Sequence, residues 1–305
     1  RIESYKPEFN KIANTLAAGF ACACFCFLNR GGLIECVLAG VAAGFGQSVR
    51  RIMMAKKTNH FAVWMTAGFA ASLVYIGCAV LLETMLQRAY SPAVLATIPP
   101  WITADPLGFR VGIVSAVLFL VPGFPLITSM LDLVRLDLSA GIPRLVYTLM
   151  LIISAGASVW IVSLTFHWAV DPAVNPPLEG HWLYFARTFC SFVASAGFAM
   201  LFNSTRRLCV YAGLICALVN PLRFFVAESG FNWQFSVGLE ALTIGLLADV
   251  ISRLSNFNYS RVSLSVPAAV LMVPGVPLYS ALVHLNEGNT IGCLLYTSDA
   301  ADERS

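Results

Sequence analysis

The sequence predicts an all-α polytopic membrane protein with nine transmembrane helices visible of an expected ten, arranged as two inverted five-helix repeats. Three observations support this class. The chain is 58% hydrophobic and 11% charged, whereas soluble domains are roughly 25% charged. Its mean hydropathy is +0.76. A Pro-Gly-x-Pro-Leu motif occurs twice inside long apolar runs, within Val121–Leu126 and again 152 residues later within Val273–Leu278.

The expected spans follow from apolar runs of about 20 residues, the length needed to cross a bilayer. Nine such runs are present, at residues 12–28, 32–49, 61–82, 111–131, 143–167, 182–203, 208–226, 233–252 and 262–285.

Positively charged loops indicate which ends of these spans stay in the cytoplasm. Most lysines and arginines flank the spans on the side of the N-terminus, whereas only Arg30, Arg88, Arg110 and Arg223 flank them on the other side. Tryptophans, which favour the headgroup region, gather on that second side. We therefore expect a multi-pass protein of the bacterial inner membrane with a cytoplasmic N-terminus. The net charge of +3 reflects this topology, so nucleic-acid binding is not implied.

The two motifs predict broken helices of opposite direction. Proline removes a backbone donor and clashes with the preceding turn, so two prolines around a glycine should interrupt a span. With the orientation above, residues 111–131 run inward and residues 262–285 run outward, which makes the repeat inverted. Matching broken helices in two halves point to a transport site. A second echo, Phe27-Leu-Asn29 and Leu201-Phe-Asn203, has an offset of 174, and the long segment 83–110 accounts for the difference.

The expected organisation has four parts. Residues 1–11 are a cytosolic lead-in, residues 12–168 form the first transmembrane half and residues 181–288 form the second. Residues 289–305 turn polar where a tenth helix should run. We expect this stretch to be non-native sequence, with a genuine short tail as the alternative.

Several stretches resemble the threonine/serine exporter family. Cys22–Gly32 and Leu120–Ile127 are similar to its first half, of the YjjP type, and Ala196–Asn203 and Pro274–Pro277 to its second half, of the YjjB type. The resemblance covers roughly residues 8–288. It implies a ten-helix bacterial inner-membrane exporter of small carboxylate-bearing metabolites, here with both halves fused, and it supplies no binding residues.

The broken helices are the expected substrate site, because helix N-termini favour anions. We expect the half-helices around Gly123 and Gly275 to present free amides to a carboxylate, with nearby hydroxyls as further donors. The alternative is that the prolines kink the helices only for packing. The residues expected to bind substrate here are Pro122, Gly123, Pro125, Thr128, Ser129, Pro274, Gly275, Pro277 and Ser280.

Charged residues deep in apolar spans are functional candidates. Arg187 is expected to bind a substrate carboxylate, unless it extends to the membrane surface. Glu240 is the deepest acid, and the alternative to a functional role is an interhelical ion pair. Asp132 and His284 follow the two motifs at equivalent positions and are expected to gate or couple protons together with Glu240, unless they are interfacial polar residues.

These features favour a secondary exporter driven by an ion gradient, with no catalytic residues, metal or cofactor. No Gly-x4-Gly-Lys-Ser/Thr sequence for ATP binding is present. A channel or scaffold subunit is the alternative, and an intramembrane enzyme is less favoured. The expected partners are a small-molecule substrate and the lipid bilayer. Threonine, serine and succinate all remain open as substrates, as does homo-oligomerisation.

Overall fold

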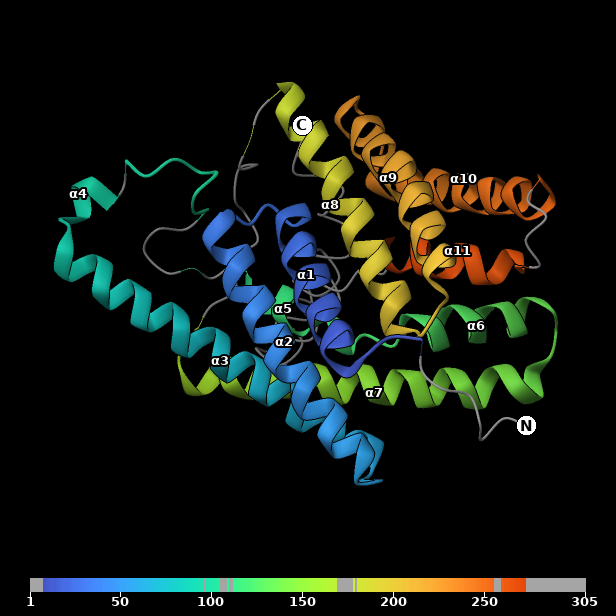
Figure 1. The fold of residues 1–305 in the computed structure, drawn as a ribbon, viewed down its shortest axis with the longest axis horizontal. Helices are drawn as coiled ribbons and strands as arrows, with labels where there is room; N and C mark the ends of the chain where they lie inside the picture. Colours follow the sequence, from blue (N-terminus) through green and yellow to red (C-terminus); the bar gives the residue numbers. More distant parts are fainter. Residues whose placement is uncertain are drawn as a thin grey trace.

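The computed structural model describes residues 8–95, 97–104, 109, 112–168, 178, 180–254 and 259–272. Within these residues every regular element is a helix (Figure 1). Seven helices in the described part of the chain are long and apolar enough to cross a membrane, and one bent pair there forms an eighth candidate. The expected polytopic all-α class is confirmed. The second Pro-Gly motif lies outside the described residues, and with it the predicted site residues Pro274, Gly275, Pro277, Ser280 and His284.

The helices follow the first eight expected spans, although α2 and α3 extend six and seven residues further than expected, and the ninth span is described only as far as residue 272. Pro221 lies inside the continuous helix α9. The elements are α1 Lys11–Leu28, α2 Leu33–Ala55, α3 His60–Ala89, α4 Pro92–Leu95, α5 Gly112–Val117, the 3₁₀ turn η1 Leu118–Leu120, α6 Gly123–Val134, α7 Leu138–Thr165, α8 Gly180–Leu201, α9 Arg206–Glu228, α10 Trp233–Leu254, α11 Arg261–Ala269 and the 3₁₀ turn η2 Val270–Met272.

The two halves repeat the same arrangement of neighbours. In the first half α1 packs on α2, α2 on α3, and α5 on all three; in the second half α8 packs on α9, α9 on α10, and α11 on all three. Helices α2 and α9 are both 23 residues long. The turns η1 and η2 each end directly before a Pro-Gly motif. The repeat therefore extends from the motifs to the helices that surround them.

The halves meet where their first helices, α1 and α8, run antiparallel (Figure 1). The Asn14 side chain near the start of α1 donates to the Met200 carbonyl near the end of α8, at 3.4 Å. Small residues allow close approach of membrane helices. Gly197 of α8 is an example, because a Cβ there would lie 2.8 Å from Ala21 Cβ. Antiparallel contact between equivalent helices is what an inverted repeat requires.

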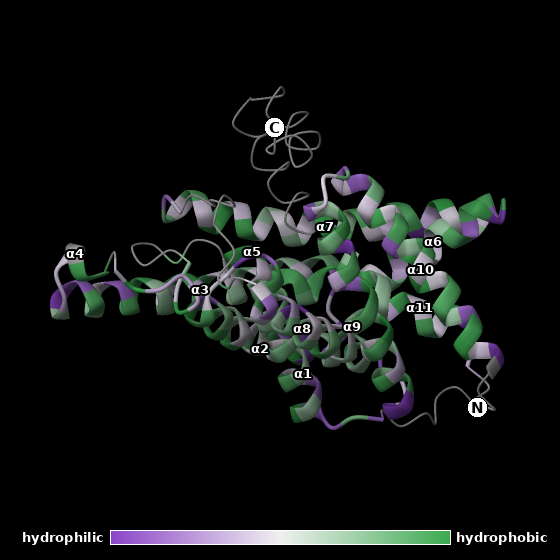
Figure 2. Ribbon diagram, turned by 90° about the horizontal axis from the view of Figure 1, so that it is seen from above, coloured by the Kyte–Doolittle hydropathy of each residue, from purple (hydrophilic) through white to green (hydrophobic). Residues whose placement is uncertain are grey.

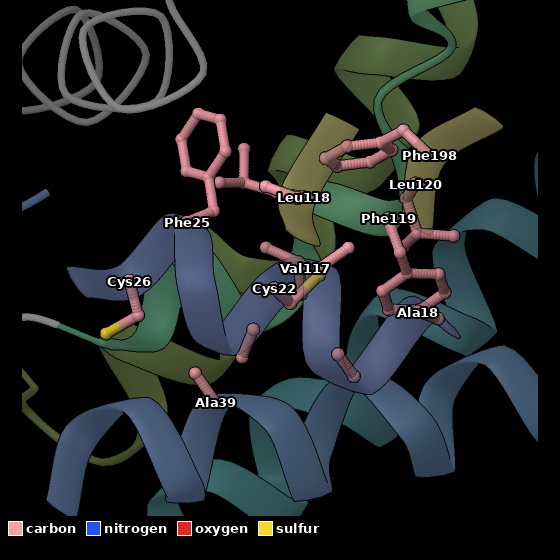
Figure 3. Close-up of a cluster of buried hydrophobic side chains, with 14 of the residues drawn as sticks. Ala18, Cys22, Phe25, Cys26, Ala39, Val117, Leu118, Phe119, Leu120 and Phe198 are labelled. Carbon is pink, nitrogen blue, oxygen red and sulfur yellow. The ribbon is translucent and has the colours of Figure 1, made fainter. Parts of the chain in front are cut away.

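The half-helix before the first motif lies inside the protein. All residues from Gly112 to Leu120 are buried. Figure 3 shows the side chains of Val117 to Leu120 between α1 residues such as Cys22 and Phe25 and Phe198 of α8. Apolar residues cover much of the outside of the long helices (Figure 2). Irregular backbone at membrane depth is tolerated where protein surrounds it, and that condition is met here.

The long segment after α3 folds back over the start of α2. The Trp101 and Ile102 carbonyls accept the first two α2 amides, from Leu33 and Ile34, at 3.0 and 2.9 Å. Glu35 is fully buried and accepts hydrogen bonds from the Thr103 hydroxyl at 2.6 Å and from the Ala104 amide at 2.9 Å. Glu35 is therefore buried between the start of α2 and this segment.

Candidate functional site

The first motif interrupts its span as predicted. The helix axis turns by 63° between Gly112–Leu120 and Gly123–Val134. The Val121 amide donates to the Leu118 carbonyl at 3.0 Å, and the Gly123 amide reaches back only to Val121 at 2.8 Å. Pro122 has no amide hydrogen, so the α-helical ladder cannot continue through it. The break therefore leaves the carbonyls at the end of η1 without helical partners.

Side chains from α2 and α3 satisfy those carbonyls. The Arg50 guanidinium donates to the Phe119 carbonyl at 3.3 Å, and the Trp64 indole N–H donates to the Leu120 carbonyl at 2.6 Å. The guanidinium carbon also lies 4.4 Å from the Trp64 ring centroid, a distance typical of a cation–π interaction. These carbonyls are capped by protein, so they do not require a ligand. Neither Arg50 nor Trp64 was predicted to contribute to the site.

The N-terminus of α6 offers fewer free amides than the sequence suggested. The Gly123 amide is used, Pro125 has none, and the Leu126 amide donates to the Pro122 carbonyl at 3.0 Å. Within the described chain, this leaves Phe124 as the first-turn residue whose amide has no carbonyl acceptor. The number of free amides at this half-helix is small because the second proline of the motif falls in the first turn.

The hydroxyls expected to serve as donors are engaged within α6. Thr128 donates to the Phe124 and Pro125 carbonyls at 3.0 and 3.1 Å, and the buried Ser129 donates to the Leu126 carbonyl at 2.7 Å. Serine and threonine in helices commonly bond to the preceding turn in this way. As arranged here, both hydroxyls offer lone pairs rather than protons.

The start of α6 touches the second half of the protein. A Cβ placed on Gly123 would lie 2.8 Å from Cγ2 and 3.3 Å from Cγ1 of Val270, the first residue of η2. Only glycine allows this approach without a shift of the neighbouring side chain. The break of the first half thus packs against the turn that leads into the second motif.

Arg187 is buried on α8 and paired with an acid. Its side chain is 8% exposed and lies 2.7 Å from Glu228 Oε1, at the end of α9. Tyr184 donates to the other oxygen of the same carboxylate. The guanidinium also lies 4.2 Å from the Phe224 ring centroid. Within the described residues, the Arg187 guanidinium is therefore held by Glu228 and Phe224.

Glu240 on α10 forms an interhelical ion pair with Arg223 of α9. Glu240 Oε2 lies 3.2 Å from Arg223 Nη1, and both side chains are buried. The Arg223 guanidinium stacks on Trp233 and Phe224 at 4.8 and 4.7 Å. Within the described part of the chain, no group donates a well-formed hydrogen bond to either Glu240 oxygen. The sequence analysis counted Arg223 only among the charges that flank the spans and so missed this partner.

The Phe224 ring lies against both arginines, and Asn220 of the same helix bonds to α8. Its amide nitrogen donates to the Ser191 hydroxyl at 2.7 Å, and that hydroxyl donates to the Arg187 carbonyl at 2.6 Å. We refer to Arg187, Ser191, Asn220, Arg223, Glu228 and Glu240 as the polar cluster. Its two arginines and two glutamates balance in charge. The structure thus brings Arg187 and Glu240, predicted separately, into one connected region.

Asp132 has a different neighbour. It forms an ion pair with Arg144 across the α6–α7 turn, whereas its predicted counterpart His284 lies outside the described residues.

Asp137 begins α7 in the same turn, and hydrogen bonds from the Ser139 hydroxyl and the Ala140 amide lower the pKa of its exposed carboxyl. Across the described residues, no three His, Cys, Asp or Glu side chains are grouped as metal ligands.

Comparisons with known proteins match both halves. A family model described as "Putative threonine/serine exporter" matches residues 1–166. A second, described as "Threonine/Serine exporter, ThrE", matches residues 187–301 and includes much of the stretch predicted to be a non-native tail. The chain is 25% identical over 129 residues to "Probable succinate transporter subunit YjjP" of Escherichia coli (strain K12). That alignment spans 42% of each protein. No solved structure matches the chain.

Proposed function

Since the chain belongs to the threonine/serine exporter family, we propose that it is a secondary transporter that exports small carboxylate-bearing metabolites across the bacterial inner membrane. The proposed orientation has a cytoplasmic N-terminus, in line with the distribution of lysine and arginine. An ion gradient would drive export. The substrates we favour are threonine and serine, or a dicarboxylate such as the succinate in the name of the E. coli relative.

The buried break at Pro122–Gly123 carries the proposal. It interrupts a span within the protein, bends the axis by 63°, and packs against Val270 of the other half. A break that served only to kink a helix would not need to lie between two antiparallel halves. Broken spans at a repeat interface are typical of substrate sites in secondary transporters.

The chemistry of the break and that of the polar cluster, taken separately, support a carboxylate-bearing substrate. The Phe124 amide at the α6 N-terminus favours an anion, and the arginines of the polar cluster suit planar carboxylates. Glu240 is the acidic group that an ammonium would require. Because the polar cluster is balanced in charge, it suits a zwitterionic amino acid, whereas succinate would need a further positive partner.

Gating is proposed for the α6–α7 turn. The ion pair between Asp132 and Arg144 joins the half-helix that follows the break to the next span, so its opening would free α6 to move. In this proposal His284 has the corresponding role after the second motif.

The experiment is counterflow in proteoliposomes loaded with unlabelled threonine, serine or succinate and supplied with the labelled compound. Uptake of label stimulated by internal substrate supports exchange by a transporter. Gly123→Leu and Gly275→Leu should abolish it. Gly77→Leu and Gly245→Leu are matched controls, because a Cβ at either glycine meets no atom within 4 Å. Passage of label without stimulation would indicate a channel, and no passage of any of the three would indicate a scaffold.

A further inference from the structure

The internal repeat pairs Arg50 with Arg223. Helices α2 and α9 begin at Leu33 and Arg206, 173 residues apart, and Arg50 and Arg223 are separated by the same 173 residues. Each arginine stacks on a tryptophan of the next helix, Trp64 of α3 at 4.4 Å and Trp233 of α10 at 4.8 Å. By this offset the two guanidiniums occupy equivalent places in the two halves, whereas the tryptophans do not, since Trp64 corresponds to Val237 and Trp233 to His60.

Their hydrogen-bonding partners differ. Arg50 donates to the Phe119 carbonyl in the 3₁₀ turn before the first break. Arg223 instead pairs with Glu240, and its Nε has no acceptor among the described residues. The repeat relates Phe119 to Leu271, the middle residue of η2.

An acid in only one half explains the difference. Helices α3 and α10 begin 173 residues apart at His60 and Trp233, so the equivalent of Glu240 in the first half is Ala67, which is fully buried and carries no charge. In the first half the guanidinium has no carboxylate to attract it and binds the carbonyl. In the second half the buried carboxylate draws the guanidinium to itself, because two opposite charges attract each other more strongly than a charge and a neutral carbonyl dipole.

We infer that Arg50 and Arg223 are equivalent positioning residues, each able to hold the 3₁₀ turn before the break of its own half, and that Glu240 competes with the Leu271 carbonyl for Arg223. The structure shows the first half with its turn held and the second with its arginine on the acid. When Arg223 is released from Glu240, it can donate to the Leu271 carbonyl, as Arg50 does to the Phe119 carbonyl in the first half. This inference rests on the proposed transport function, since exchange of arrangement between inverted halves is how such a site would open alternately to either side.

Hydrogen exchange measured by mass spectrometry tests the inference in reconstituted protein. Arg50→Gln is expected to increase amide exchange in residues 117–127 by about tenfold, as expected for loss of a hydrogen bond from a charged donor. Arg51→Gln is the matched control. It removes the same charge one residue away, from a side chain that bonds to Thr15 at 3.1 Å and not to η1, and should leave that segment unchanged. No increase with Arg50→Gln would overturn the role given to Arg50.

The competition is tested with Glu240→Gln, which should slow exchange in residues 264–272 by freeing Arg223 for the η2 turn. The double variant Arg223→Gln/Glu240→Gln should abolish this protection. Unchanged exchange in Glu240→Gln, or protection that persists in the double variant, contradicts the competition. If Glu240→Gln does not fold, the second test compares the double variant with Arg223→Gln alone. Both lack the arginine, so their amide exchange in residues 264–272 is expected to be equal. Unequal exchange contradicts the inference. Hydrogen exchange is measured without substrate. A failure of the proposed transport activity would therefore be detected separately, in the counterflow experiment.

Discussion

The contact between Gly123 and Val270 predicts a specific coupling between the two halves. In Gly123→Ala the new Cβ would lie 2.8 Å from Val270 Cγ2, and ordinary contact begins near 3.4 Å, so either backbone or side chain must move. Overpacking of this kind costs about 1–3 kcal/mol. Val270→Ala removes both γ-methyls, and the nearest remaining atom is then Cβ at 3.5 Å.

The magnitudes define a double-mutant cycle. Val270→Ala alone should cost about 1.5 kcal/mol, from two buried methyl groups at ~0.8 kcal/mol each. Gly123→Ala/Val270→Ala should cost less than the sum of the single variants, by about 1 kcal/mol or more, because contacting residues couple by about 0.5–3 kcal/mol. The free energies would be measured by denaturant or thermal unfolding in a fixed detergent, with counterflow as a second readout.

Gly77→Ala on α3 supplies the control for helix propensity. A Cβ there meets no atom within 4 Å, and alanine in place of glycine inside a helix should stabilise by up to about 1 kcal/mol. Strict additivity in the cycle would refute the reasoning, and so would a Gly123→Ala variant as stable as Gly77→Ala.

Three further predictions follow from the polar contacts. Arg223→Ala should destabilise by about 3–5 kcal/mol, because it leaves the buried Glu240 carboxylate without its partner. Glu240→Ala should destabilise less, because Arg223 can then donate to the Leu271 carbonyl. The double variant should lose less than the sum of the two in thermal unfolding, and additivity would argue against the pair. Trp64→Phe should cost about 1–3 kcal/mol by leaving the buried Leu120 carbonyl without its donor, and unfolding at wild-type temperature would contradict this. The pKa of Asp137 is lowered below its ordinary 3.8. Its carboxylate therefore stabilises the folded state fully above the unfolded pKa, and this contribution is lost as pH falls through the folded pKa. Unfolding curves of Asp137→Asn and wild type should differ at pH 6 and converge near pH 2; a constant difference would contradict the cap.

Much of the site could be found in the sequence because the signals are local. Pro122 lacks an amide hydrogen wherever it is placed, so its break was predictable. Deep charges such as Arg187 and Glu240 stand out in apolar runs. The missed residues share a different property. Arg50 and Arg223 lie near helix ends, where an arginine ordinarily extends to the surface, and the one signal that marks them is their equal place in the two repeats.

The sequence by itself determined the spans, the interrupted helix and the pairing of the two halves, since apolar length and missing amide donors are properties of the chain. Only the tertiary structure decided the partners: Arg223 for Glu240, Arg50 and Trp64 for the carbonyls of η1, and Thr103 for Glu35. The physical reason is that each partner comes from a different helix or segment. Which side chains meet depends on how each helix is rotated and how closely it packs. Small residues such as Gly197 and Ala21 set how closely α1 and α8 approach each other. The residue pattern of one helix does not specify this distance.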